Sequence, residues 1–231
     1  LAKAMELLLS ISEIALGYPV EIEFALNIPK EEDTSAELVI LQIRNMMPPS
    51  ETEDVQLNDF SKEDVICYSE NALGNGTITD IKDIVYVDPE TFDMGQSQQI
   101  VPLLRDINLS LMEMQKPYLL IGPGRWGSAD PWLGIPVIWS DIAGAKTIVE
   151  TPLKEKSIEP SQGSHFFHDM VSSQVGYLIT QSKKSILNWK YLFSLPKVFD
   201  EKSVCHVKTD SPLSVHLDGR NRKGIIVKDK K

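Results

Sequence analysis

The feature that most constrains how this 231-residue chain folds is a short apolar segment at residues 118–122, YLLIG, which runs into a corner rich in glycine and proline. A strand without charged residues is typically buried on both faces, like the central strands of layered α/β proteins. A helical apolar pattern precedes it at 96–114, and a second apolar strand is predicted at 145–151. This order of helix and strands predicts a mixed α/β fold.

The corner at 119–136, LLIGPGRWGSADPWLGIP, suits the binding of an anion. Its glycines permit positive φ and expose backbone N–H groups, and the guanidinium of Arg125 offers a fork for a phosphate or a carboxylate. The candidate anion-site residues are Gly122, Gly124, Arg125 and Gly127. The alternative is a rigid corner that only holds the fold together, with Arg125 paired to Asp130 or another acid. Neither the P-loop nor the dinucleotide-binding glycine pattern is present.

Charge and composition exclude several kinds of partner. The chain has 33 acidic and 23 basic residues, and its net charge of −10 disfavours nucleic acid and anionic membrane surfaces. No apolar run approaches the roughly 20 residues of a membrane-spanning helix, and no secretory signal peptide opens the sequence, so we expect a cytoplasmic protein. Cys67 and Cys205 stand in apolar contexts and are expected to be buried thiols.

Pattern and composition divide the chain into a helix–hairpin region, an acidic proline-bearing stretch typical of a linker, an α/β region and a strand-rich C-terminal part. These regions cover residues 1–46, 47–63, 64–155 and 156–231, respectively. The last two can belong to the same domain. In the first region we expect a helix at 1–16, with Leu8 and Ile11 on its buried face, and a hairpin of two strands at 20–28 and 36–45.

The predicted hairpin brings polar side chains together. Alternation along a strand puts Glu21 and Glu23 on one face, and Gln42 and Arg44 have the same spacing on the other strand. Carboxylates hold Mg²⁺, whereas an amide and a guanidinium hold phosphate oxygens. The set therefore predicts a site for a magnesium–nucleoside triphosphate. The alternative is an outer face of the hairpin, on which these side chains are only solvated.

Around these residues the sequence resembles the end of the ATP-grasp nucleotide-binding domain of phosphoenolpyruvate synthase and pyruvate phosphate dikinase. The resemblance lies in the phrases GYPVEIEFALN and LVILQIRN, which follow a helix as in that family. It implies that Glu21, Glu23 and Gln42 bind MgATP, the two acids toward Mg²⁺, and that Arg44 lies beside the phosphates. Two positions depart from the family pattern, because Val20 replaces a glutamine and Glu21 replaces an aspartate.

Phosphoenolpyruvate synthases carry a swivelling domain after ATP-grasp, with a phosphate-carrying histidine in a glycine-rich loop. The corner resembles that loop in its closing phrase LGIP, but has Ser128, Ala129 and Asp130 where the histidine would stand. We therefore assign no phosphocarrier role to it. Phrases similar to the corner and to PSQGSHFF also follow the ATP-grasp part of longer bacterial proteins of this kind, so the resemblance extends to the whole chain.

Two histidines form a further candidate site. His165 and His168 lie three residues apart, so a helix would place them on one face, and Asp169 or Glu159 would be additional metal ligands. The favoured alternative is a short helix capped by Ser164, with Phe166 or Phe167 buried and the histidines at a domain boundary.

Two functions are consistent with these residues. The chain is expected to be a fragment of an ATP-dependent phosphotransferase, with ATP and Mg²⁺ as ligands and pyruvate or another phosphoryl acceptor as substrate. The chain lacks an initiator methionine, and the family's N-terminal ATP-grasp region would precede Leu1, so this fragment alone is expected to be inactive. The alternative is a non-catalytic nucleotide- or anion-binding module with a regulatory or interaction role.

Overall fold

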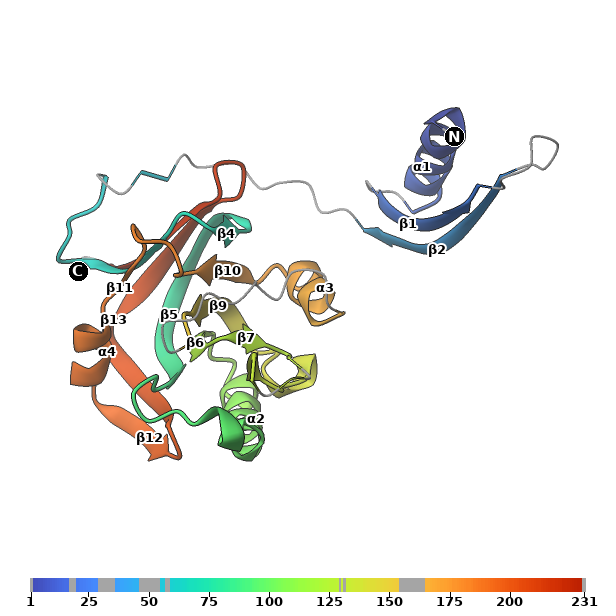
Figure 1. Cartoon of the computed structure of the whole chain (residues 1–231). Helices are drawn as coiled ribbons and strands as arrows, with labels where there is room; N and C mark the ends of the chain where they lie inside the picture. The colour runs from blue at the N-terminus through green and yellow to red at the C-terminus, as the bar shows by residue number, and fades with distance from the viewer. Residues whose placement is uncertain are drawn as a thin grey trace. The chain divides into compact units, whose positions relative to one another are not determined.

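The structure is a computed structural model that describes residues 2–16, 20–28, 36–45, 55–56, 59–128, 130, 132–153 and 165–229 (Figure 1). The chain divides into two compact units, Leu1–Ser50 and Glu51–Lys231, which we describe separately. Both units contain helices and strands, so the predicted mixed α/β class is confirmed. Within the residues that the structure describes, no helix has the length and apolar character needed to cross a membrane.

The first unit is a helix beside a two-stranded hairpin. Its elements are α1 (Ala2–Leu16), β1 (Val20–Asn27) and β2 (Glu37–Asn45). The two strands pair antiparallel, which confirms the predicted hairpin. The predicted buried face of the helix is wrong in part, because Ile11 is 54% exposed whereas Ser12 is buried. The stripe that is covered instead runs through Met5, Leu8 and Ser12, at the i, i+3, i+7 spacing of one helix face.

A one-residue bulge lies in the hairpin, between Ile40 and Gln42 of β2. The pairing with β1 shifts at the same place, which leaves Leu41 as the extra residue. Because a slip of one residue turns the side chains of a strand to the other face, the bulge is what keeps Gln42 opposite Glu23.

The second unit is built on one large sheet of ten strands. The strand order is β11-β3-β14-β13-β5-β6-β9-β10-β4, and β12 pairs with β13 off this path. The strands are β3 (Val65–Ser69), β4 (Ala72–Leu73), β5 (Asn75–Val87), β6 (Tyr118–Pro123), β9 (Ala145–Thr151), β10 (Gly176–Ile179), β11 (Ile186–Leu187), β12 (Lys197–Glu201), β13 (Val204–Asp218) and β14 (Lys223–Lys228). Strands from the predicted regions 64–155 and 156–231 therefore lie in the same sheet.

Four neighbouring strands, β5, β6, β9 and β10, run parallel to one another. Their connections hold α2 (Ser97–Glu113), the short strands β7 (Arg125–Trp126) and β8 (Gly134–Ile135), and α3 (His165–Ser172). Figure 1 shows α2 and α3 on one side of the sheet and α4 (Trp189–Ser194) on the other, and each side has its own apolar core. Cover on both faces explains why β6 is buried along its length and why β9 is buried at every position except Lys146.

One antiparallel strand is longer than the sequence pattern predicts. β13 has 15 residues, where the pattern indicates separate strands near 203–209 and 212–217. Its pairing with β5 shifts register twice between Lys208 and Val215. Pro212 lies in this stretch and has no N–H to donate to a neighbouring strand. The two predicted strands are therefore one strand with an irregular middle.

A buried asparagine joins α2 to the parallel sheet. Asn108 is fully buried, and its Oδ1 accepts hydrogen bonds from Tyr118 Oη at 3.0 Å and from the backbone N–H of Gly144 at 2.8 Å. Its Nδ2 donates to the carbonyl of Ser140 at 3.2 Å, in the short helix η3 (Trp139–Asp141). One side chain thus fixes α2, the start of β6 and the segment that leads into β9.

We expect Asn108→Ala to destabilise the second unit by about 2–4 kcal/mol, because it leaves buried donors and an acceptor without partners. Tyr118→Phe removes one of these bonds and should cost about 1 kcal/mol. Urea unfolding followed by circular dichroism measures both values. A cost for Asn108→Ala no larger than that for Tyr118→Phe would contradict the role of Asn108 as a junction.

Candidate functional site

The four hairpin residues predicted to bind a nucleotide occupy neighbouring positions of the β1–β2 ladder. Glu21 pairs with Arg44, and Glu23 pairs with Gln42. Residues directly opposite each other in an antiparallel pair lie on the same face. Glu21, Glu23 and Gln42 are exposed, whereas the side chain of Arg44 lies outside the described residues. The backbone thus brings all four positions together, as the alternation of the sequence predicts.

This donor set suits a magnesium–phosphate ligand better than a bare metal ion. In the described ranges, no group of three or more His, Cys, Asp or Glu side chains is placed to hold a metal by itself. Mg²⁺ is commonly bound through only one or two carboxylates, with substrate phosphates and water completing its coordination. The carboxylates of Glu21 and Glu23 fit that mode, with Gln42 beside them for a phosphate oxygen.

The glycine corner after β6 has its backbone donors already engaged. Each N–H group from residue 124 to residue 127 donates to an acceptor within the protein. The pairs are Gly124 with Thr151 O at 3.0 Å, Arg125 with Leu133 O at 2.8 Å, Trp126 with Glu150 Oε1 at 3.1 Å, and Gly127 with Ile135 O at 2.9 Å. An anion cradle needs N–H groups that point at the ligand. In this conformation the four N–H groups brace the corner instead.

The glycines of the corner also allow close packing. A Cβ atom on Gly124 would lie 2.5 Å from the carbonyl oxygen of Leu133, and one on Gly127 would lie 2.6 Å from the ring of Phe166. A Cβ atom on Gly122 would collide with the indole of Trp126, which is itself buried. Gly124 and Gly127 have φ values of +72° and +74°, which favour glycine. Both observations support the rigid-corner interpretation.

The predicted anion-site residues therefore lie together at the carboxyl end of β6, but the N–H groups of residues 124–127 are engaged within the protein. The guanidinium of Arg125 is half-buried. Asp130, its suggested partner, uses Oδ1 to accept the backbone N–H of Trp132 at 2.9 Å, and its own N–H donates to Ser128 Oγ at 3.2 Å. Ser128 and Asp130 thus form a local turn where the family resemblance would place a carrier histidine.

The two cysteines were predicted to be buried thiols. Cys67 and Cys205 are buried free thiols, as predicted, and burial raises the pKa of Cys67 to about 12 and that of Cys205 to about 11. These thiols are protonated at neutral pH and are therefore poor nucleophiles.

His165 and His168 lie on α3, which confirms the predicted helix, but their side chains and residues 154–164 lie outside the described residues.

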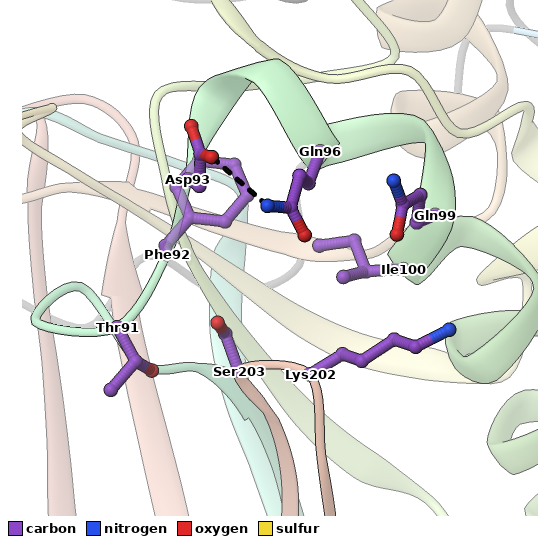
Figure 2. Close-up of a pocket in the computed structure, with 8 residues that line it drawn as sticks. All are labelled: Thr91, Phe92, Asp93, Gln96, Gln99, Ile100, Lys202 and Ser203. Carbon is purple, nitrogen blue, oxygen red and sulfur yellow. Dashed lines mark hydrogen bonds between the residues drawn. The ribbon is translucent and has the colours of Figure 1, made fainter.

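A cavity of about 280 Å³ lies at the start of α2, next to the β12–β13 turn (Figure 2). Gln96, Gln99 and Lys202 stand around it, and Gln96 Nε2 donates to Asp93 Oδ2 at 3.2 Å. Lys202 and Ser203 have φ values of +49° and +70°, which form the tight turn. The four side chains at 93, 96, 99 and 202 are exposed, so this cavity is a hollow of the surface. Sequence analysis missed it, because its walls come from segments about a hundred residues apart.

A buried histidine–aspartate pair joins β13 to β5. His206 and Asp83 are 7% and 4% exposed, and His206 Nε2 lies 2.8 Å from Asp83 Oδ1. Burial raises the pKa of Asp83, but the hydrogen bond and charge of His206, with smaller contributions from Lys208 and Lys116, outweigh it and leave the pKa below its usual value. Asp83 is therefore ionised at neutral pH and accepts the Nε2 proton.

Comparison with protein-family models, curated proteins and solved structures finds no match to this chain. The resemblance to phosphoenolpyruvate synthases therefore rests on the motif phrases alone. The hairpin register adds a geometric observation to the first of these phrases, and the engaged N–H groups of the corner separate it from the phosphate-binding loops that it resembles in composition.

Gly127→Ala should destabilise the second unit by about 1–3 kcal/mol, because the methyl group meets Phe166 and the residue keeps a positive φ. Gly95→Ala is a matched control, since its Cβ would lie at an ordinary distance of 3.4 Å from Asp93 Oδ1. Thermal unfolding of the two variants measures the difference. Equal midpoints for both would show that Gly127 is not a packing glycine.

The Asp83–His206 pair should make stability depend on acid pH. Because the folded pKa of Asp83 lies below its ordinary value of 3.8, the pair stabilises the fold above that value, and this contribution is lost as pH falls through the folded pKa. We expect Asp83→Asn to lower the free energy of unfolding by about 2 kcal/mol at neutral pH. Below about pH 4, the difference in stability between the variant and the original protein should become smaller. Urea unfolding of both proteins over this range tests it. A difference that stays constant down to about pH 2 would contradict the assignment.

Proposed function

We propose that this chain is part of an ATP-dependent phosphotransferase of the phosphoenolpyruvate synthase kind, in which the β1–β2 hairpin binds the magnesium–nucleotide. The observation that carries the proposal is the ladder register, which sets Glu21 opposite Arg44 and Glu23 opposite Gln42. The family resemblance assigns MgATP to the same four positions. The motif and the strand pairing thus point to the same four positions.

The residues of the hairpin differ in the part of the magnesium–nucleotide that they can bind. Glu21 and Glu23 supply hard carboxylate oxygens for Mg²⁺, whereas Gln42 and Arg44 supply hydrogen-bond donors for phosphate oxygens. When bound, the metal ion neutralises charge that develops on the phosphates during transfer. The hairpin holds these groups on a paired backbone, so the ladder sets their relative positions rather than a loop.

The phosphoryl acceptor is pyruvate under the family resemblance, or another small acceptor. Within the part of the corner that the structure describes, Ser128 and Asp130 bond to each other, and no histidine is present. The acceptor therefore receives the phosphoryl group without a carrier at this corner. A second candidate function, a nucleotide-binding module without catalysis, is favoured by the same observation and by the engaged N–H groups of the corner.

Glu23→Gln should weaken MgATP binding about tenfold or more, because a neutral amide replaces a carboxylate ligand of the metal. Glu37→Gln is the matched control, since Glu37 is also exposed on the hairpin but pairs with Asn27 at its other end. Isothermal titration calorimetry on the protein expressed from its complete gene measures both affinities. If the two variants bind MgATP equally well, the proposed site is wrong.

Product analysis separates the two functions. The protein is incubated with MgATP, with and without pyruvate, and AMP, ADP and phosphate are followed. Turnover that Glu23→Gln abolishes and Glu37→Gln retains supports the phosphotransferase. Tight binding without turnover under any condition supports the non-catalytic module.

A further inference from the structure

A second cavity, of about 320 Å³, lies between α2 and β12, and we call it the α2–β12 cavity. Its helix wall presents Leu103, Asp106 and Ser110, which lie three and four residues apart and so share one face of α2. Its strand wall presents Phe199. His206, the partner of Asp83 in the buried pair, also lines the cavity. The cavity is remote from the hairpin in the sequence and belongs to the second unit.

The strand wall is built with a bulge. The pairing of β12 with β13 shifts between Lys197 and Phe199, and Phe199 is opposite His206. In a regular strand, successive side chains point to opposite faces, but here the successive residues Val198 and Phe199 both line the cavity. The bulge therefore adds Val198 to the apolar surface that β12 offers at this point.

The histidine on the strand wall is fixed by its pair with Asp83. His206 Nε2 lies 2.8 Å from Asp83 Oδ1, and in the neutral tautomer that donates this bond the lone pair is on Nδ1. Within the described part of the chain, no hydrogen bond to Nδ1 is found. His206 is 7% exposed and is the most buried polar residue that lines the cavity.

All three polar groups of the cavity can accept a hydrogen bond, and one carries a negative charge. These groups are the carboxylate of Asp106, the hydroxyl of Ser110 and Nδ1 of His206. A protonated primary amine donates three hydrogen bonds and is attracted by the carboxylate, whereas a carboxylic acid is repelled by it. The remaining lining is apolar and suits a hydrocarbon body.

From this arrangement we propose that the α2–β12 cavity binds a small primary amine with an apolar body, its ammonium group toward Asp106, Ser110 and His206 and its hydrocarbon part against Leu103, Val198 and Phe199. This site is separate from the proposed nucleotide site and does not depend on it.

The test uses 2-phenylethylamine as the probe, with 3-phenylpropionate as an acid of similar shape and 2-phenylethanol as a neutral analogue. Binding to the full chain is followed by two-dimensional NMR at neutral pH. We expect the amine to shift the amide signals of β12 and of the middle of α2, with a Kd of about 1 mM or below. The acid should cause no shift at the same concentration.

Variants then test the individual contacts. Asp106→Asn, at an exposed helix position, should weaken amine binding about tenfold and leave binding of the alcohol unchanged. Leu103→Trp should fill the cavity and abolish binding of both, and Ser110→Leu is a second blocking variant at an exposed position. Glu23→Gln in the hairpin should leave amine binding unchanged.

Three results would each overturn the proposal. They are the absence of amine-induced shifts up to about ten times the expected Kd, equal binding of the acid and the amine, and unchanged amine binding in a folded Ser110→Leu variant. None of these results bears on MgATP binding, so this inference and the proposed function fail separately.

Discussion

The parallel alignment of β5, β6, β9 and β10 is the constraint on which the larger unit depends. Parallel neighbours cannot be joined by a tight hairpin, so each connection crosses one face of the sheet. As a result, α2 and α3 lie on the same side of the sheet (Figure 1), and their contacts with it form the apolar core of that side. Asn108 connects α2 to the sheet, because it forms hydrogen bonds with the start of β6 and with the segment before β9.

The same alignment explains the glycine corner. The carboxyl ends of β6 and β9 meet at one edge of the sheet, where the chain leaves β6 and turns sharply. Glu150, near the end of β9, is buried there and accepts the N–H of Trp126 at the corner. The corner's composition suits a phosphate loop, but its backbone donors stabilise the turn. Composition alone does not distinguish these two uses of glycine, because the difference lies in where the N–H groups point.

The nucleotide site depends on a different and smaller constraint. Glu21 and Glu23 lie opposite Arg44 and Gln42 only because Leu41 is an extra, unpaired residue of β2. The bulge is not visible in the sequence, because residues 38–41 are all apolar and Leu41 and Ile43 alternate regularly with Gln42 and Arg44. A hairpin with perfect alternation in both strands would place Ile43 and Ile40 on opposite faces.

The success of sequence analysis differs between parts of the molecule for physical reasons. The hairpin, α2, β6 and β9 were predictable, because their apolar patterns are regular and local. The joining of two predicted strands into β13 was not, since pairing with β5 continues past Pro212. The Asp83–His206 pair and the α2–β12 cavity were also missed, because the fold brings their residues together from distant positions in the sequence, 123 residues apart for the pair.

The most direct test of the central claim is to locate the metal–nucleotide by paramagnetic broadening. ¹⁵N-labelled protein is titrated with ATP and Mn²⁺ in place of Mg²⁺, and the loss of each amide signal is followed. The account predicts that the amides of Glu21–Glu23 and their partners around Gln42 broaden first, at substoichiometric Mn²⁺, and only when ATP is present. Early broadening elsewhere, with the hairpin amides unaffected, would contradict it.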